Sequence, residues 1–190
     1  MKILIVYYSQ SGNTQKVARS IRDGLREAGC EVNLKFINKV SYDELSEYDA
    51  IGIGSPIWYE MTPNVRKWIE EMPFQNGKPA FSFNTHATLP GLYFPLVIRR
   101  MTGRGLKVVD WRDWYGDSAM QIFPEPYYTD GHPDEKDLSE AFDWGRELAG
   151  KFKAIEAGED LEYPEAPAPD FIPVHAMVAI EHLGGSHNIH

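Results

Sequence analysis

The sequence predicts an α/β domain built on a doubly wound, five-stranded parallel sheet. Five apolar, strand-like runs alternate along the chain with segments of helical periodicity. Such an alternation requires right-handed crossovers, which place helices on both faces of a parallel sheet. The 190 residues are 43% hydrophobic and 13% aromatic, which is enough to form one core of ordinary size.

The predicted strands differ in how they are buried. Residues 2–8 (KILIVYY) are almost continuously apolar, as in a strand that is covered on both faces. Residues 31–37 (EVNLKFI) alternate in polarity and predict a strand at the edge of the sheet. The other three strands are expected at residues 48–55, 78–84 and 106–114.

Four segments show helical patterns. Residues 14–28 place apolar side chains at helical spacing, with charged residues on the opposite face. These apolar positions are Val17, Ala18, Ile21, Leu25 and Ala28. Further helices are expected at residues 63–72, 92–102 and 133–158. The last of them begins with a proline and acidic residues, which the helix dipole favours in a first turn.

The chain divides into a domain, residues 1–162, and a Pro-rich C-terminal extension, residues 163–190, here called the C-terminal arm. Four prolines near the start of the arm predict an extended segment, and the apolar residues after them are expected to lie against a surface. That surface is either the chain's own domain or a second subunit. We favour the second, a homodimer with exchanged arms.

Charge and composition exclude several classes of protein. The net charge is −9, and residues 108–190 hold 5 Lys and Arg against 18 Asp and Glu. An acidic surface argues against nucleic acid as a partner and favours a basic one, although it could also serve only solubility. Nowhere does the sequence contain the run of about 18 apolar residues that would predict a membrane span, so we expect a cytoplasmic location. The single cysteine, Cys30, excludes a cysteine-only cluster within this chain.

Several catalytic classes are also excluded by the loop sequences. Neither the phosphate-binding pattern GxxxxGK[ST] nor a strand-placed GxGxxG occurs, and there is no GxSxG of a hydrolase. The acidic residues that a response regulator carries after its first and third strands are absent. The histidines match no familiar metal-site spacing, so no metal is predicted, and only His86 is expected near a functional site.

Small polar residues follow the first predicted strand. Residues 9–14 (SQSGNT) combine hydroxyl groups, backbone N–H groups and the start of a helix. A phosphate is bound by such donors, and Gly12 lets the backbone curve around it. A helix cap alone would account for one hydroxyl group but not for three. The sequence therefore predicts a phosphate site here.

Two further loops lie at the same edge of the predicted sheet. Residues 52–63 (GIGSPIWYEMTP) turn at Ser55-Pro56 and then expose aromatic side chains, which suit the flat face of a ring system. Residues 84–91 (NTHATLPG) offer small polar groups for the polar edge of a ring. In an open α/β sheet, ligands bind at this carboxyl edge, where the strand order reverses.

These three loops resemble the FMN-binding loops of the flavodoxin family. The resemblance spans residues 1 to about 157 in the family's order, and GHPDEKDL before the last helix is similar to flavodoxin domains that are fused to ferredoxin modules, here without the cluster module. It implies a sheet order of 2-1-3-4-5, FMN as the cofactor and no catalytic side chain. The third loop lacks the tyrosine that flavodoxins often stack on the flavin, for which Tyr93 or Trp114 are alternatives.

The resemblance also implies a role for each loop. The phosphate would be held by Ser9, Gln10, Ser11, Gly12, Asn13 and Thr14. One flavin face would be lined by Pro56, Ile57, Trp58 and Tyr59, and the pyrimidine side and opposite edge by Asn84, Thr85, His86, Ala87 and Gly91. A rim that docks a basic redox protein is expected after the fifth strand, at Asp110, Asp113, Asp117, Glu125, Asp130, Asp134, Glu135 and Asp137.

Three functions remain open. The first is an FMN-dependent electron-transfer protein that serves another redox protein, and this is the function we expect. The second is an NAD(P)H-dependent, FMN-containing reductase of quinones or similar acceptors. The third is a flavodoxin-like interaction module without a cofactor, which a colourless protein that refuses FMN would indicate.

Overall fold

The computed structural model of the chain describes residues 1–58, 60–118 and 127–167. Its parallel strands lie in the spatial order β2 (Glu31–Phe36), β1 (Lys2–Tyr7), β3 (Ala50–Trp58), β5 (Pro79–His86) and β6 (Lys107–Tyr115). The predicted order 2-1-3-4-5 is thus confirmed, with the alternating strand at the edge. The difference is β4 (Glu60–Met61), a short strand that pairs antiparallel with β3 and was not predicted.

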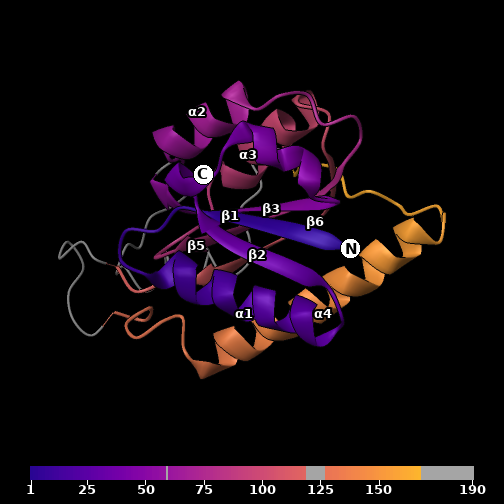
Figure 1. The fold of residues 1–190 in the computed structure, drawn as a ribbon. Coiled ribbons are helices and arrows are strands. Elements are labelled where there is room, and N and C mark those ends of the chain that lie inside the picture. Colours follow the sequence, from indigo (N-terminus) through magenta and orange to yellow (C-terminus); the bar gives the residue numbers. More distant parts are fainter. Residues whose placement is uncertain (59, 119–126, 168–190) are drawn as a thin grey trace.

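Helices cover both faces of the sheet, as Figure 1 shows. One face carries α1 (Asn13–Glu27) and α4 (Glu135–Glu156), and the other carries α2 (Pro63–Glu71) and α3 (Tyr93–Gly103). Each of these four α-helices begins and ends within two residues of its predicted bounds, because apolar periodicity and capping residues mark helices locally. Two short 3₁₀ helices, η1 (Ile37–Lys39) and η2 (Tyr42–Glu47), were not predicted.

Each face of the sheet has its own hydrophobic core. Ile3 and Ile5 point to the α1/α4 face, whereas Leu4 and Val6 point to the α2/α3 face, so β1 is buried on both sides. On the α1/α4 face, the glycines of β3 leave room for the phenylalanines of β5. A Cβ atom at Gly54 would lie 2.0 Å from Cζ of Phe83, so only glycine fits under that ring.

The parallel strands bring four loops to one edge of the sheet. β1, β3, β5 and β6 run in the same direction, so their carboxyl ends lie side by side, here called the carboxyl edge. The described start of the C-terminal arm lies at the opposite edge, where Lys107 Nζ is 5.4 Å from the ring centre of Tyr163. The prediction that the arm, residues 163–190, is exchanged in a homodimer stays a prediction, because residues 168–190 lie outside the described residues.

No helix within the described residues combines the length and the apolar character needed to cross a membrane.

Candidate functional site

The first predicted loop curls around Gly12. This residue directly precedes α1 and has φ 96° and ψ −11°, a left-handed conformation that costs glycine little. Its N–H donates to Ser9 Oγ at 3.1 Å, and its carbonyl accepts the Lys16 N–H at 3.0 Å. Gln10 and Ser11 are exposed at the tip of the loop.

The beginning of α1 carries no side-chain cap. Among the described residues, no side chain accepts a hydrogen bond from its first N–H groups, and its first turn contains no acidic residue. The first N–H groups of a helix have no partner within the helix and carry part of the positive end of the helix dipole. This end of α1 is therefore suited to an anion, as the three hydroxyl groups predict.

Two contacts join the first loop to neighbouring strands. The hydroxyl groups of Thr14 and Thr85 are 2.7 Å apart and buried, which links the start of α1 to the end of β5. Asn13 Nδ2 donates to the Asp117 carbonyl at 2.8 Å, which links it to the segment after β6. The structure therefore brings the predicted first and third loops together.

The second predicted loop is in part a strand. β3 continues through Pro56 and Ile57 to Trp58 and then turns back into β4, whereas the sequence predicted that it ends at Ser55. Ile57 is half-buried and packs on the α2/α3 core. The side chain of Trp58 and all of Tyr59, the predicted aromatic wall, lie outside the described residues. The contact of Trp58 with a flavin stays a prediction.

The third predicted loop also begins later than expected. Asn84, Thr85 and His86 are the last residues of β5 and are buried. Asn84 Nδ2 donates to the Ser55 carbonyl at 3.0 Å, which joins the second and third segments. Its Oδ1 atom is buried with no hydrogen-bond partner among the described residues. Such an acceptor is costly to bury unless a ligand or water satisfies it.

Beyond β5, the chain leaves the sheet through half-buried residues. Ala87 is half-buried, and Gly91 has φ 49° where the chain turns into α3. Neither Tyr93 nor Trp114, the two alternatives for the missing flavin-stacking tyrosine, is exposed at this loop. Tyr93 is fully buried and donates to the Phe83 carbonyl at 3.2 Å, and Trp114 packs edge-on against Trp144. Both side chains belong to the core.

A tyrosine that the sequence did not single out lies at the third loop. The Tyr128 hydroxyl donates to the Ala87 carbonyl at 3.1 Å, and its ring lies 5.5 Å from that of Tyr115. Burial, followed by the neighbouring Tyr127, raises the pKa of Tyr128 above the usual value. The hydroxyl therefore stays protonated and available as a donor at neutral pH.

His86 forms a buried pair with a carboxylate of β6. Its side chain is 1% exposed, and Nε2 lies 2.8 Å from Asp113 Oδ2. The ring of Tyr115 stands edge-on to the imidazole at 5.3 Å. Burial raises the pKa of Tyr115, and the charge of Asp113 adds to this effect, so Tyr115 is neutral at neutral pH. The prediction that His86 lies with the third-loop residues agrees with this position.

The pair opens into a cleft of about 290 Å³ between β6 and the start of α4. Its lining residues are His86, Asp113, Trp114, Tyr115, His132, Asp134, Lys136, Asp137 and Glu140. His132 lies here as well, with its ring centre 5.7 Å from that of Tyr115. The cleft therefore contains two histidines, whereas only His86 was predicted near a functional site.

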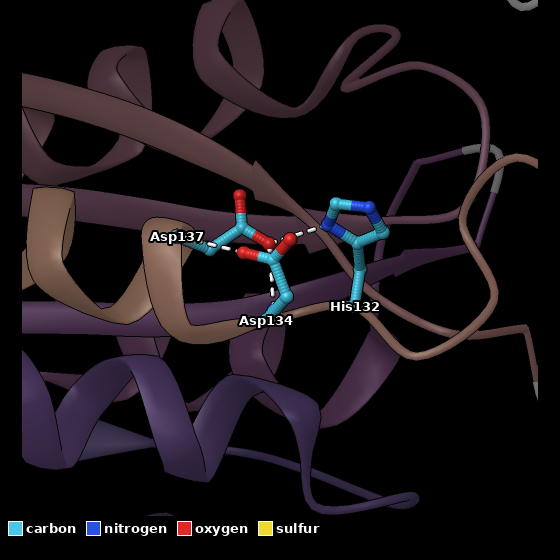
Figure 2. Close-up of side chains that lie close together, drawn as sticks. All are labelled: His132, Asp134 and Asp137. Atoms are coloured by element: carbon cyan, nitrogen blue, oxygen red, sulfur yellow. Dashed lines mark hydrogen bonds and ion pairs between the residues drawn. The ribbon is translucent and has the colours of Figure 1, made fainter.

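A second histidine–carboxylate pair lies at the start of α4, as Figure 2 shows. His132, Asp134 and Asp137 hold their ligand-type atoms within 4.8 Å of one another. The carboxylate oxygens, however, already cap the start of α4. Asp134 Oδ1 accepts the Asp137 N–H, and Asp137 Oδ2 accepts the Asp134 N–H and contacts His132 Nδ1. Helix capping therefore accounts for this cluster.

The predicted acidic rim is only partly at the carboxyl edge. Asp110 binds Lys151 Nζ at 2.7 Å and Trp144 Nε1 at 3.0 Å along α4, so it does not belong to the rim. Asp113 is paired with His86. Four members are exposed, namely Asp117, Asp130, Asp134 and Glu135, whereas Glu125 lies outside the described residues.

The sequence placed Asp117 only in the docking rim and did not predict that the segment after β6 contacts the loops of the candidate site. The Asp117 carbonyl accepts a hydrogen bond from Asn13 of the first loop, and the Tyr128 hydroxyl donates to the Ala87 carbonyl of the third loop. The His132 carbonyl accepts the Asp117 N–H. One local signal was available: Asp134 and Asp137 have the spacing of a capping box, which marks where the loop ends and α4 begins.

Comparisons of the sequence and of the structure with known proteins both find flavodoxins. Residues 4–85 match the family model described as a flavodoxin domain. A flavodoxin of Clostridium saccharobutylicum is 26% identical over 163 residues, which cover 82% of this chain and 99% of that protein. A protein named NAD(P)H dehydrogenase (quinone) from Methylocella silvestris is 26% identical in an alignment that covers 80% of this chain and 98% of that protein.

A solved structure of a flavodoxin from the domain Archaea superimposes with a TM-score of 0.65 at 28% identity, covering 80% of this chain and 99% of that one. Family relatives of this kind imply a flavin cofactor and a redox role. The matched residues, the sheet order and the relatives aligned over nearly their full length support the assignment of this chain to the flavodoxin family.

Proposed function

We propose that the chain is an FMN-dependent electron-transfer protein that exchanges electrons with another redox protein. The observation that carries this proposal is the uncapped start of α1, preceded by the left-handed Gly12 and joined to the end of β5 by the Thr14–Thr85 contact. An anion-binding helix end lying beside two strand ends fits a ligand with a phosphate group and a polar ring.

The residues present fit FMN at both of its ends. Residues 9–14 would hold the phosphate through hydroxyl and backbone N–H groups. The buried Oδ1 of Asn84 is an acceptor that still needs a donor, and the N–H of a flavin pyrimidine ring is such a donor. Residues 56–59 would cover one ring face. FMN supplies the one- and two-electron chemistry, and the protein binds it and limits the access of water.

We propose FMN rather than FAD because FMN ends at its phosphate group, and the start of α1 would hold that terminal phosphate. We expect Thr14→Asp to abolish FMN retention, since the hydroxyl that meets Thr85 is lost and a carboxylate faces the phosphate. The measurement is the flavin absorbance of the purified protein after gel filtration with added FMN. Ser46→Asp is the matched control, because Ser46 is exposed in η2, before β3, far from the carboxyl edge.

A yellow Thr14→Asp protein with unchanged FMN affinity would contradict the phosphate site. A wild-type protein that stays colourless with excess FMN would instead support the cofactor-free interaction module.

A second function has one supporting observation. The relative from Methylocella silvestris is named an NAD(P)H dehydrogenase (quinone) and is aligned over nearly its whole length. The alternative is therefore an NAD(P)H-dependent reductase of quinones or similar acceptors. Anaerobic addition of NADH or NADPH distinguishes the two functions: rapid bleaching of the bound flavin indicates the reductase, and no bleaching indicates the carrier.

A further inference from the structure

The pair of His86 and Asp113 is a buried ionisable group with its own opening to solvent. His86 Nε2 lies 2.8 Å from Asp113 Oδ2, and the two side chains are 1% and 14% exposed. Burial disfavours the charged imidazolium, whereas the carboxylate favours it. Protonation of His86 is therefore set by two opposing effects and responds to a further charge nearby.

His86 lies within the proposed flavin site. The preceding Thr85 contacts Thr14 of the phosphate loop at 2.7 Å, and the following Ala87 belongs to the third loop. A charge added to the flavin would thus arise near the imidazole. In this partly buried region, charges interact more strongly than in bulk water.

Titratable side chains from β6 and from the start of α4 surround His86 and line the cleft beside it. From β6 it faces Asp113 and Tyr115, and the ring of Tyr128 lies behind Tyr115. From the start of α4 and the loop before it, the cleft receives His132, Asp134, Lys136, Asp137 and Glu140. Tyr115 and Tyr128 stay neutral at neutral pH, because burial raises the pKa of both hydroxyls. Asp113 borders the cleft and connects the imidazole to solvent.

We propose that His86 is a redox-linked proton acceptor, which takes one proton from solvent when electrons enter the flavin and releases it when they leave. The electrons come from an external reductant and end on the flavin. The proton comes from water and ends on the imidazole, and no bond forms between His86 and the flavin. This proposal rests on the proposed FMN-dependent function.

The test measures the one-electron reduction potentials of the FMN-loaded protein between pH 5.5 and pH 8.5. For the wild type, we expect a pH range in which one potential falls by about 59 mV more per pH unit than in His86→Gln, because a tenfold change in proton concentration corresponds to that value. Asp113→Asn should move this range to lower pH, since the imidazolium loses its carboxylate. His132→Gln is the matched control and should keep the wild-type profile, because it removes the other histidine of the cleft.

A second measurement needs no variant. In the wild-type protein, the ring protons of His86 are titrated by NMR in the oxidised and reduced forms. We expect the midpoint to move to a proton concentration at least tenfold lower after reduction. Identical midpoints, or potentials of His86→Gln that follow the wild-type pH profile, would overturn the proposal while leaving the FMN-dependent function intact. A protein that does not bind FMN would overturn both.

Discussion

At the scale of single residues, the third loop is held by a hydrogen bond from a residue more than 40 positions away. The Tyr128 hydroxyl donates to the Ala87 carbonyl, and the rings of Tyr127 and Tyr128 lie 4.5 Å apart. Since the loop after β5 belongs to the proposed flavin site, this bond would order a surface that otherwise must be ordered when the cofactor binds.

We expect Tyr128→Phe to weaken FMN binding by about fivefold, which corresponds to the ~1 kcal/mol of a typical hydrogen bond. Fluorescence titration of the apoprotein with FMN measures this loss. Tyr42→Phe is the matched control, because the Tyr42 hydroxyl donates to the Trp68 carbonyl at 3.0 Å away from the site. Equal FMN affinity of the two variants would show that Tyr128 has no role in binding.

The same bond has a defined pH dependence. Because burial raises the pKa of Tyr128, its contribution to folding is fully present below the unfolded value near 10 and is lost only as the pH rises through the higher folded-state value. The difference in FMN affinity between wild type and Tyr128→Phe should therefore be constant from pH 6 to pH 9.

At the scale of elements, β3 and β5 are matched by size. The glycines of β3 face the phenylalanines of β5 on the α1/α4 face, and the rings of Phe81 and Phe83 are stacked with centres 6.4 Å apart. Phe81 also packs against Trp144 and Phe152 of α4, so this packing joins the sheet to that helix. It also supports the strand ends that form the proposed site.

We expect Gly54→Ala to lower the free energy of unfolding by about 1–3 kcal/mol, because its Cβ would overlap the Phe83 ring. Urea unfolding followed by circular dichroism measures this change, and the double variant Gly54→Ala/Phe83→Leu should recover part of it. Gly150→Ala is the control with the opposite sign: nothing lies within 4 Å of its Cβ, and alanine favours the interior of α4. Equal stabilities of the two alanine variants would contradict the matched packing.

At the scale of the whole molecule, charge is unevenly distributed. Residues 1–107 hold 14 Lys and Arg against 10 Asp and Glu, so the acidic excess belongs to the second part of the chain. Asp117, Asp130, Asp134 and Glu135 are exposed around the segment that follows β6. These four residues are the exposed members of the proposed docking rim for a basic redox partner that lie within the described residues.

We expect electron transfer from the reduced protein to a small basic haem protein to slow as salt rises, because the screening length is about 10 Å at 0.1 M. Stopped-flow mixing measures the rate, and an uncharged quinone acceptor provides the salt-independent reference. The double variant Asp130→Asn/Glu135→Gln should reduce the salt dependence, whereas Glu31→Gln, at the opposite edge of the sheet, should not. A salt-independent rate with the basic acceptor would exclude the rim as a docking surface.

The sequence by itself determined the type of nearly every element and the place of the phosphate loop. Apolar periodicity, capping residues and loop composition are local properties, so the bounds of α1 and the turn at Gly12 could be predicted without a partner segment. The short strand β4 could not, because a two-residue strand leaves no periodicity. The extension of β3 through Pro56 was missed because its ladder depends on β5 rather than on its own residues.

Only the tertiary structure decided which side chains meet at the carboxyl edge. Thr14 and Thr85 are separated by 71 positions, Asn13 and Asp117 by 104, and His86 and Asp113 by 27. Such pairs depend on the register of parallel strands and on the path of the segment after β6, which local periodicity does not encode. The helix end that suits a phosphate is a property of the sequence, whereas the buried histidine–carboxylate pair beside it exists only because β5 and β6 run side by side.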